Sequence, residues 1–336
     1  MTLDEETAAP RRARRRPARR LVVAAVLTLV LAIGVLPDLF GGLDGHSPFA
    51  QLQAFRQWTL LAVAVLGLLL AAATLRWRRI WPFAAGVLAV AVVGAVLVVP
   101  RAVPDPAPTG GRTLTVLSFN TYEGHADVQA LAAVIRTEKP DLVALPEAGD
   151  RFRSKLAPLI EPLGYRVRAS TGPRQRDVNG VTVAVAGRLG DVQMSVGDDT
   201  TSFPYLVVTG GALGSLRFVG FHSVAPTLKA TPYWRHDLGL LPQWCAGPTP
   251  AIVAGDFNAT LDHSVLRDAS VGCGDAAAQR GQGLQPTWGP TDLLRHTIGP
   301  QIDHVLSTNG IEASAFHVLD VPGSDHRPIL ATLQVP

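Results

Sequence analysis

Polar side chains gather in six short motifs, each at the end or the start of an expected β-strand. In chain order the motifs are Ser118-Phe119-Asn120, Leu145-Pro146-Glu147, Phe221-His222-Ser223, Gly255-Asp256-Phe257-Asn258, Ile302-Asp303-His304-Val305 and Gly323-Ser324-Asp325-His326-Arg327-Pro328. Taken one at a time, such motifs are typical of turns, helix caps and solvated loops, because Gly, Asp, Asn and Ser favour these conformations. Strand ends can converge on one edge of a sheet, so the co-occurrence of all six predicts one shared site.

Three of these side chains offer the hard oxygen ligands that a divalent cation prefers. The carboxylates of Glu147 and Asp325 and the amide oxygen of Asn120 suit Mg²⁺, or Mn²⁺ in its place. Such an ion binds a few oxygens, keeps several waters and bridges to phosphate. The set contains no cysteine and few candidate histidine ligands, which argues against zinc.

The remaining polar residues could carry out proton chemistry on a phosphoester. Hydrolysis needs a metal ion to neutralise charge, a group that orients or deprotonates water, and a donor for the leaving oxygen. Asp256 and His326 could move these protons. Asp303 could hydrogen-bond to His326, fix its tautomer and favour its charged form. The combination predicts a metal-dependent phosphoric ester hydrolase.

Short strands and few helices are expected over residues 113–336, which carry the motifs. Alternation and turn residues predict strands at Leu114–Ser118, Asp141–Leu145, Val181–Ala186, Leu206–Val208, Leu216–Phe221, Ala251–Ala254, Ile302–Leu306 and Ile329–Leu333. Helical spacing predicts helices over Ala126–Lys139, stopping before Pro140, and over Tyr233–Trp244. With no strict β-α-β order, the pattern indicates an α+β domain whose sheets pack face to face.

Three uncharged apolar stretches occupy the first hundred residues: Leu21–Leu36, Thr59–Leu75 and Ile80–Val99. A membrane crossing needs about 17–25 apolar residues. Buried core helices are the alternative for all three. A cleavable signal peptide is the alternative for the first, but no small-x-small cleavage site follows it. We expect a membrane anchor of three transmembrane helices over residues 21–99.

Arginines set the expected orientation of this anchor. Seven lie in the tail, residues 1–20, three in the turn 76–79, and one in the loop 37–58. Basic residues in short loops stay on the cytoplasmic side, so the tail is predicted to be cytoplasmic and the 37–58 loop to lie outside. Three crossings of the cytoplasmic membrane then place a Pro/Gly-rich tether, residues 100–112, and an extracytoplasmic domain, residues 113–336, outside as well.

The formal net charge of +3 is divided unevenly along the chain. Residues 100–336 carry 19 basic and 22 acidic side chains, so the positive excess lies on the cytoplasmic side, where anionic lipid attracts it. The domain therefore has no electrostatic footprint for nucleic acid, and a membrane lipid or lipid-linked phosphate is the expected partner. Cys245 and Cys273 could form a disulfide outside the cell, but the sequence leaves this open.

The motifs resemble those of the endonuclease/exonuclease/phosphatase superfamily, in the same order and over about Thr113 to Leu333. Gly-Asp-Phe-Asn and Ser-Asp-His-Arg-Pro, when both are present, are specific to this superfamily. Pro286-Thr287-Trp288 also resembles the segment that precedes the family's penultimate motif, here Ile302-Asp303-His304. The resemblance implies a four-layer sandwich, two mixed β-sheets flanked by helices. It implies metal binding by Asn120 and Glu147, with Asp325 near the metal, and catalytic roles for His222, Asp256, Asn258, Asp303 and His326.

The resemblance also implies how the catalytic roles divide. Asp256 would orient or deprotonate the attacking water, with Asn258 beside it holding phosphate or water. His222 would contact the scissile phosphate or protonate the leaving group, and Asp303 would pair with His326. Family members differ on whether the histidine or the aspartate is the general base, so both alternatives stay open.

Two positions depart from the family pattern. Pro146 stands where the family usually has Gln, and Tyr122 stands where some nucleases carry an acidic residue. Three crossings ahead of such a domain, with Leu-Pro-Glu at 145–147, also resemble actinobacterial membrane proteins associated with teicoplanin-type glycopeptide resistance. That resemblance implies a lipid-linked cell-wall precursor or its carrier pyrophosphate as the substrate.

Three functions remain as hypotheses. The first is hydrolysis of a phosphoester or pyrophosphate on a phospholipid or polyprenyl lipid, in which Arg166, Arg168, Arg174 and Arg176 either hold a second phosphate or form a solvated loop. The second is an extracellular surface nuclease, which would show a steep salt dependence. The third is a non-catalytic resistance or binding module that keeps the fold. The loops 170–179 and 227–234 are expected to shape the pocket.

Overall fold

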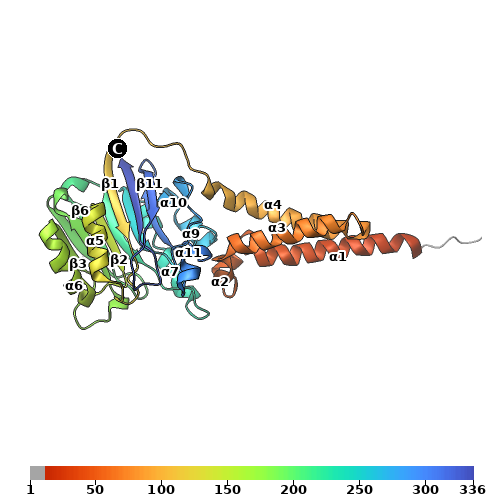
Figure 1. Cartoon of the computed structure of the whole chain (residues 1–336), viewed down its shortest axis with the longest axis horizontal. Coiled ribbons are helices and arrows are strands. Elements are labelled where there is room, and N and C mark those ends of the chain that lie inside the picture. Colours follow the sequence, from red (N-terminus) through yellow and green to blue (C-terminus); the bar gives the residue numbers. More distant parts are fainter. Residues whose placement is uncertain (1–11) are drawn as a thin grey trace, which may run out of the picture. The chain divides into compact units, whose positions relative to one another are not determined.

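The computed structural model describes residues 12–336, which form two compact units (Figure 1). The first, which we call the helical unit, comprises the described residues up to Pro37 together with Gln57–Val96. The second, the sheet unit, comprises Asp38–Arg56 together with Leu97–Pro336. Residues 1–11 of the predicted cytoplasmic tail lie outside the described residues.

Three long helices make up the helical unit. They are α1 (Arg12–Val35), α3 (Arg56–Ala73) and α4 (Trp81–Val98). Over Ala18–Val35, Arg56–Ala73 and Arg78–Ala102 the chain is helical, long and apolar enough to cross a membrane. The three expected apolar helices are therefore confirmed, while their insertion in a membrane and their sidedness stay predictions.

Two six-stranded sheets form the centre of the sheet unit. Their strand orders are β11-β12-β1-β2-β4-β3 and β5-β6-β7-β8-β10-β9. The strands are β1 (Arg112–Ser118), β2 (Leu142–Pro146), β3 (Tyr165–Ala169), β4 (Val181–Ala186), β5 (Val192–Gly197), β6 (Tyr205–Gly210), β7 (Arg217–His222), β8 (Ala251–Asp256), β9 (Cys273–Asp275), β10 (Asp303–Thr308), β11 (Glu312–Val318) and β12 (Ile329–Val335). The pairs β1–β2 and β7–β8 are parallel and the other pairs are antiparallel, so both sheets are mixed.

Helices in the sheet unit are mostly short. They are α2 (Phe49–Gln53), α5 (Val128–Glu138), α6 (Asp150–Ile160), α7 (Thr231–Leu238), α8 (Pro242–Cys245), α9 (Ser264–Ala269), α10 (Ala276–Gln279) and α11 (Asp292–Thr297). Helix α5 has a clear chemical start, because the carboxylate of Asp127 accepts from the backbone N–H groups of Gln129 and Ala130. It ends at Glu138, and the next residue, Lys139, adopts a left-handed conformation just before Pro140.

Apolar side chains fill three layers of the sheet unit. One layer lies between the two sheets and includes Val116 and Phe218. A second packs the outer face of the first sheet against α5 and α6, with Phe152 fully buried. The third packs the second sheet against α7 and α8 and contains Trp234 and Trp244. Helices therefore cover both outer faces (Figure 1), and the expected four-layer sandwich is confirmed.

The chain between the first two apolar helices, Asp38–Arg56, is folded into the sheet unit. We call it the connecting segment. Its buried Arg56 donates to Asp38 at 2.7 Å and to Asp262 at 3.2 Å. Asp38 also pairs with Arg267 at 2.8 Å. These contacts fix both ends of the connecting segment on the loop and helix that follow β8.

Further contacts bury the middle of the connecting segment. Ala50 is fully buried in the third apolar layer. Its carbonyl oxygen accepts from Nε2 of the buried His263 at 2.8 Å. Asp44 accepts from the hydroxyl of Ser264 at 2.7 Å, which ties the segment to the first turn of α9. The sequence had assigned this loop no role in the domain.

The start of the predicted tether is also held by the sheet unit. Arg101 forms an ion pair with Asp262 at 2.6 Å. The backbone N–H of Asp105 donates to the carbonyl of Gln279 at 2.9 Å, and Pro104 bridges to Arg280. The stretch from Arg101 to Asp105 therefore packs against the domain, although its composition predicts an extended linker.

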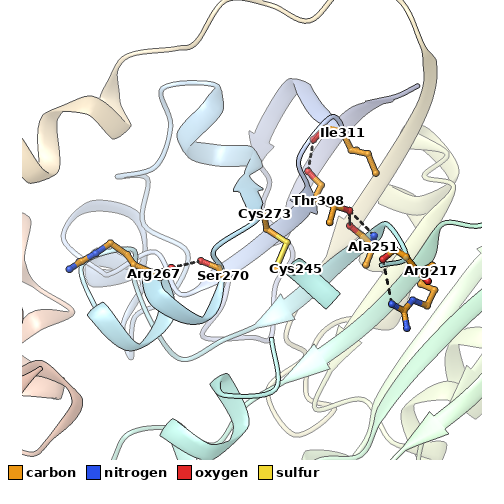
Figure 2. The surroundings of a disulfide bond; sticks show 10 residues. Arg217, Cys245, Ala251, Arg267, Ser270, Cys273, Thr308 and Ile311 are labelled. Carbon is orange, nitrogen blue, oxygen red and sulfur yellow. Dashed lines mark hydrogen bonds between the residues drawn. A yellow bond between two sulfur atoms is a disulfide. The ribbon is translucent and has the colours of Figure 1, made fainter. Parts of the chain in front are cut away.

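A disulfide bond joins Cys245 and Cys273 (Figure 2). Cys245 ends α8 and Cys273 begins β9, so the bond ties a covering helix to the edge strand of the second sheet. This answers the question that the sequence left open.

Candidate active site

Strand register brings the polar motifs together at one edge of the sandwich. In the second sheet, His222 at the end of β7 pairs in register with Asp256 at the end of β8. Asp256 in turn lies opposite Asp303, the first residue of β10. In the first sheet, Ser118 at the end of β1 pairs with Ile329, the first residue of β12. The residues before β12 are therefore delivered to the end of β1, beside Asn120.

Asp256 lies at the centre of the site and is almost fully buried. Its Oδ1 accepts from the backbone N–H of Asn258 at 2.8 Å, and its Oδ2 accepts from Nδ2 of Asn120 at 2.9 Å. Burial raises the pKa of Asp256 to about 7, against the opposing effect of His326. A carboxyl group in this range can exchange a proton near neutral pH.

A glycine brings Asp256 this close to β7. A Cβ built on Gly255 would lie 1.7 Å from the carbonyl oxygen of Phe221, so only glycine allows the two backbones to approach here. The sequence suggested that Gly-Asp-Phe-Asn alone would be a turn. In the structure its first two residues instead end a buried strand.

Glu147 faces Asp256 from the first sheet. Its Oε1 accepts from Nδ2 of Asn120 at 3.1 Å, and its Oε2 accepts from the backbone N–H of Glu123 at 2.7 Å. Burial raises the pKa of Glu147 above its usual value. Glu147 also has a positive φ of 56°, a conformation that costs energy in a non-glycine residue and is often found at functional sites.

Asn120 links the two carboxylates through its amide nitrogen. Its amide oxygen accepts from the backbone N–H of Tyr122 at 2.9 Å. In this arrangement the side chain bridges Glu147 and Asp256, and the oxygen that was expected to bind a metal accepts one hydrogen bond and keeps a second lone pair. The metal role of Asn120 stays a prediction, while its bridging role follows from the contacts.

His326 is held by the buried carboxylate of Asp303. Its Nδ1 lies 2.9 Å from Asp303 Oδ2, and its Nε2 lies 3.7 Å from Asp256 Oδ2. Burial alone would lower the pKa of His326, but Asp303 and Asp256 outweigh it and raise the pKa to about 10. The predicted pairing of Asp303 with His326 is present in the structure, and it favours the charged imidazole.

His222 approaches the same carboxylates from the other side. Its Nε2 lies 3.7 Å from Asp256 and 4.0 Å from Glu147, and its ring stacks on Phe203 with the centroids 4.2 Å apart. Burial and the neighbouring His326 lower the pKa of His222 to about 3. The two histidines thus differ in charge although both face Asp256.

Several residues that position the site were not assigned a role from the sequence. Trp288 donates from Nε1 to Asp325 Oδ2 at 2.9 Å. The hydroxyl of Ser324 donates to the carbonyl of Asn120 at 2.8 Å and accepts from the backbone N–H of His326 at 3.0 Å. Ser324 could have been found from the sequence, because it lies within the motif that contains Asp325 and His326. Phe203 carried no sequence signal, because its loop has no motif.

Three of the four arginines considered as a second phosphate site, Arg166, Arg168 and Arg176, have partners within the domain. Arg176 forms an ion pair with Glu123 at 2.6 Å. Arg166 donates to the carbonyl of Gly190, and Arg168 to that of Met194. Arg166 and Arg168 therefore tie strand β3 to the chain around β5. Arg176 lies beside the backbone that contacts Glu147.

A model of the endonuclease/exonuclease/phosphatase family matches residues 117–326. The chain belongs to this family. The match covers every residue of the site described above, from Asn120 to His326. Members of the endonuclease/exonuclease/phosphatase family are hydrolases that act on phosphoesters. No curated protein is a detectable relative of the chain.

Solved structures of the endonuclease/exonuclease/phosphatase type are similar to this chain in fold. One from Beutenbergia cavernae is 20% identical with a TM-score of 0.51, and the match covers 67% of this chain and 72% of the other. One from Bacteroides thetaiotaomicron is 17% identical with a TM-score of 0.50, over 68% of this chain and 100% of the other. D. rerio TDP2 in complex with a single-strand DNA product is 15% identical with a TM-score of 0.52, over 66% and 99%. At these identities the likeness is one of fold.

Enzymes of this family typically depend on a divalent metal ion, and the acidic residues here fit one. Asp256, Asp303 and His326 form a buried group whose possible ligand atoms lie within 4.8 Å of one another, and the predicted ligands Glu147 and Asp325 are not part of this group. Oδ1 of Asp303 and Oδ1 of Asp325 are buried without a hydrogen-bond partner among the described residues. Buried carboxylate oxygens that lack a donor are what a hard cation would satisfy.

Proposed function

We propose that this protein is a membrane-anchored, Mg²⁺-dependent phosphoesterase that hydrolyses a phosphate ester or pyrophosphate of a membrane lipid outside the cytoplasmic membrane. The observation that carries the proposal is the convergence of four side chains: His222 Nε2 lies 3.7 Å from Asp256 and 4.0 Å from Glu147, and His326 Nε2 lies 3.7 Å from Asp256. Carboxylates and imidazoles in this arrangement can hold a phosphate, neutralise its charge and move a proton.

Glu147 and Asp325 are the proposed ligands of the metal ion, which would neutralise charge on the phosphoryl oxygens when bound. Asp256 would accept the proton of the attacking water, because its raised pKa suits proton exchange and Asn258 holds its carboxylate in place. His326, kept charged by Asp303, would stabilise negative charge on phosphate. His222 would contact a phosphoryl oxygen through Nε2. These assignments support Asp256 over His326 as the general base.

Two features support a catalytic domain that lies on the outer side of the cytoplasmic membrane. The helical unit has three helices that could serve as an anchor, and the arginine distribution favours an inside tail. The Cys245–Cys273 disulfide of the sheet unit is typical of oxidising compartments outside the cytoplasm. The negative balance of the domain argues for a lipid substrate, such as a phospholipid or a polyprenyl phosphate intermediate of cell-wall synthesis, over a nucleic acid.

The test is a substrate panel with the full-length protein in liposomes, with Mg²⁺, Mn²⁺ or EDTA. We expect release of phosphate or headgroup from polyprenyl or phospholipid substrates with Mg²⁺, and loss of release with EDTA. Glu147→Gln should abolish it, while Asp268→Asn, an exposed aspartate outside the site, should not. Turnover of plasmid DNA or RNA, with no lipid hydrolysis, would favour the nuclease alternative. No turnover of any substrate would favour a non-catalytic module.

A further inference from the structure

An apolar pocket of about 320 Å³ lies beside the catalytic residues. Small-molecule sites have volumes of about 300–1,000 Å³ and are lined mainly by apolar and aromatic side chains. The walls here include Ala54 and Phe55 of the connecting segment, Ala225 and Pro226 from the loop after β7, and Trp288. The described residues that line it include no charged side chain, so the pocket offers nothing to compensate a buried charge.

Two residues that line the pocket also contact residues of the catalytic site. Asn258 lines the pocket and donates its backbone N–H to Asp256 at 2.8 Å. Trp288 lines the pocket and donates its indole N–H to Asp325 at 2.9 Å. A molecule whose phosphate lies at Asp256 therefore has a neighbouring apolar space for the group that the phosphate carries.

The connecting segment supplies one wall of this pocket and is firmly held there. Gln51 donates to the carbonyl of Pro226 on the loop after β7, and Ser47 is 2.9 Å from the hydroxyl of Thr231. The buried Arg56, with Asp38 and Asp262, fixes the C-terminal end of the segment. Because these contacts hold the connecting segment against the domain, the pocket is a fixed part of the sheet unit.

We infer that this pocket binds the first part of the hydrocarbon chain of the phosphoester substrate, and that the connecting segment thereby selects amphiphilic over water-soluble phosphates. The inference rests on the proposed function and adds the class of substrate. Each methylene buried in the pocket should strengthen binding about fourfold, until the space is filled. Longer chains would extend beyond it without further gain.

The test compares monoalkyl phosphates from butyl to dodecyl, below their micelle concentrations, as substrates of the full-length protein with Mg²⁺. We expect kcat/KM to rise by up to about fourfold per methylene and then reach a plateau. Ala54→Glu, which places a carboxylate in the pocket, should reduce the ratio of kcat/KM for long over short chains by about tenfold or more. Ala54→Trp should bring the plateau to a shorter chain.

Leu52→Glu is the matched control, because it adds the same charge to the same connecting segment, two residues away, at an exposed residue that does not line the pocket. It should leave the chain-length ratio unchanged. If Leu52→Glu lowered the ratio as much as Ala54→Glu, the effect would be electrostatic and the inference would be overturned. An equal kcat/KM for all chain lengths in the wild type would overturn it too, with the phosphoesterase function intact.

Binding of non-hydrolysable alkylphosphonates, followed by tryptophan fluorescence, separates this inference from the proposed function. If no alkyl phosphate is hydrolysed but phosphonate affinity still rises with chain length and falls in Ala54→Glu, the pocket assignment stands and the function fails. Affinity independent of chain length would overturn the pocket assignment. If Ala54→Glu weakened only association with liposomes, the surface would be a membrane contact and the inference would be wrong.

Discussion

Asp256 is shared by two histidines whose pKa values move in opposite directions. The pKa of His326 rises to about 10 because Asp303 and Asp256 outweigh its burial, and that of His222 falls to about 3 because it is buried near His326. A pair of titratable groups separated in this way can divide the work of donor and acceptor at one pH. Asp256 is 3.7 Å from the Nε2 atom of each histidine, and its pKa of about 7 falls between their two pKa values.

Replacing Asp256 by Asn removes the proposed base and keeps the size of the side chain. We expect kcat to fall by about 10²–10⁴-fold, the usual contribution of a positioned general base, in a phosphate-release assay with Mg²⁺. Thermal unfolding should show a folded protein. Activity within a few-fold of the wild type would exclude Asp256 as the base.

His304, next to Asp303, provides a pH test away from the reacting groups. Its Nδ1 is 2.8 Å from Asp275 Oδ2 and its Nε2 is 2.8 Å from the carbonyl of Ala259, so the charged ring can donate to both. Burial lowers the pKa of His304, but the carboxylate of Asp275 outweighs it and raises the pKa above its usual value.

Because the folded-state pKa of His304 is raised, its stabilising effect should be complete below about pH 6.5, the unfolded value, and decline as the pH rises through the raised pKa. Asp275→Asn should remove this dependence. The difference in melting temperature between wild type and variant should therefore be largest below about pH 6.5 and shrink at alkaline pH. A difference that stayed constant with pH would contradict the charged state of His304.

At the scale of residues, the sequence indicated which catalytic side chains lie together, but it did not indicate all the contacts that position them. Motifs at strand ends predicted that Glu147, Asp256 and His326 would lie together, since strand ends share sheet edges. The aromatic contacts of Trp288 and Phe203 depend on loop conformations, which local patterns do not encode. The bridging amide of Asn120 likewise depends on a side-chain orientation that only the folded site fixes.

Among the elements, β8 determines where the site forms. It has a parallel neighbour, β7, and an antiparallel neighbour, β10, and its last residue lies opposite His222 on one side and Asp303 on the other. A shift of one residue in either pairing would turn the polar side chains to the opposite face. The close approach at Gly255 allows β8 to keep this register.

The disulfide is an element-scale restraint with a measurable effect. Cys245 and Cys273 are separated by 28 residues, and a loop of this length should contribute about 3–4 kcal/mol to the free energy of unfolding. In the double variant Cys245→Ser, Cys273→Ser the free energy of unfolding should fall by about that amount, and the melting temperature should fall with it. A reductant should produce the same shift in the wild type and none in the variant; a wild type unaffected by reductant would contradict the bond.

Buried strands were predicted well and exposed ones were not. The predicted Val181–Ala186 coincides with β4, which is fully buried and apolar except for Thr182. Strands β3 and β5 escaped prediction because solvent-facing polar residues interrupt them, such as Arg166 and Arg168 in β3. The expected helix Tyr233–Trp244 is split into α7 and α8, because Gly239 and Pro242 interrupt the helical pattern.

For the molecule as a whole, the sheet unit is built from two separate parts of the sequence. Residues 38–56 and 97–336 form one compact body, although the three apolar helices lie between and before them. Nothing in local pattern distinguishes a loop that packs into a domain from a free one. Polar residues of the connecting segment are instead held by partners far away in the sequence. Asp44, for example, is hydrogen-bonded to Ser264, which lies 220 positions further along the chain.

A fragment that begins at Leu97 should consequently be much less stable than one that retains the connecting segment. Without it, His263 and Asp262 lose partners, and each buried polar group left unsatisfied costs about 1–3 kcal/mol. Adding residues 38–56 through a flexible linker that replaces residues 57–96 should restore stability in a thermal-unfolding experiment. Equal melting temperatures for the two fragments would show that the connecting segment contributes nothing.

In the membrane-anchored enzyme that we propose, the interleaving of the two units also bears on release of the domain from a cell. The chain passes between the helical unit and the sheet unit at three points, near residues 37, 56 and 96. A protease that cut once in the Pro/Gly stretch before β1 would leave the hydrolase domain attached through the buried arginine of the connecting segment. Shedding would require a second event, either another cut or unfolding, so a nicked protein should stay with the membrane fraction.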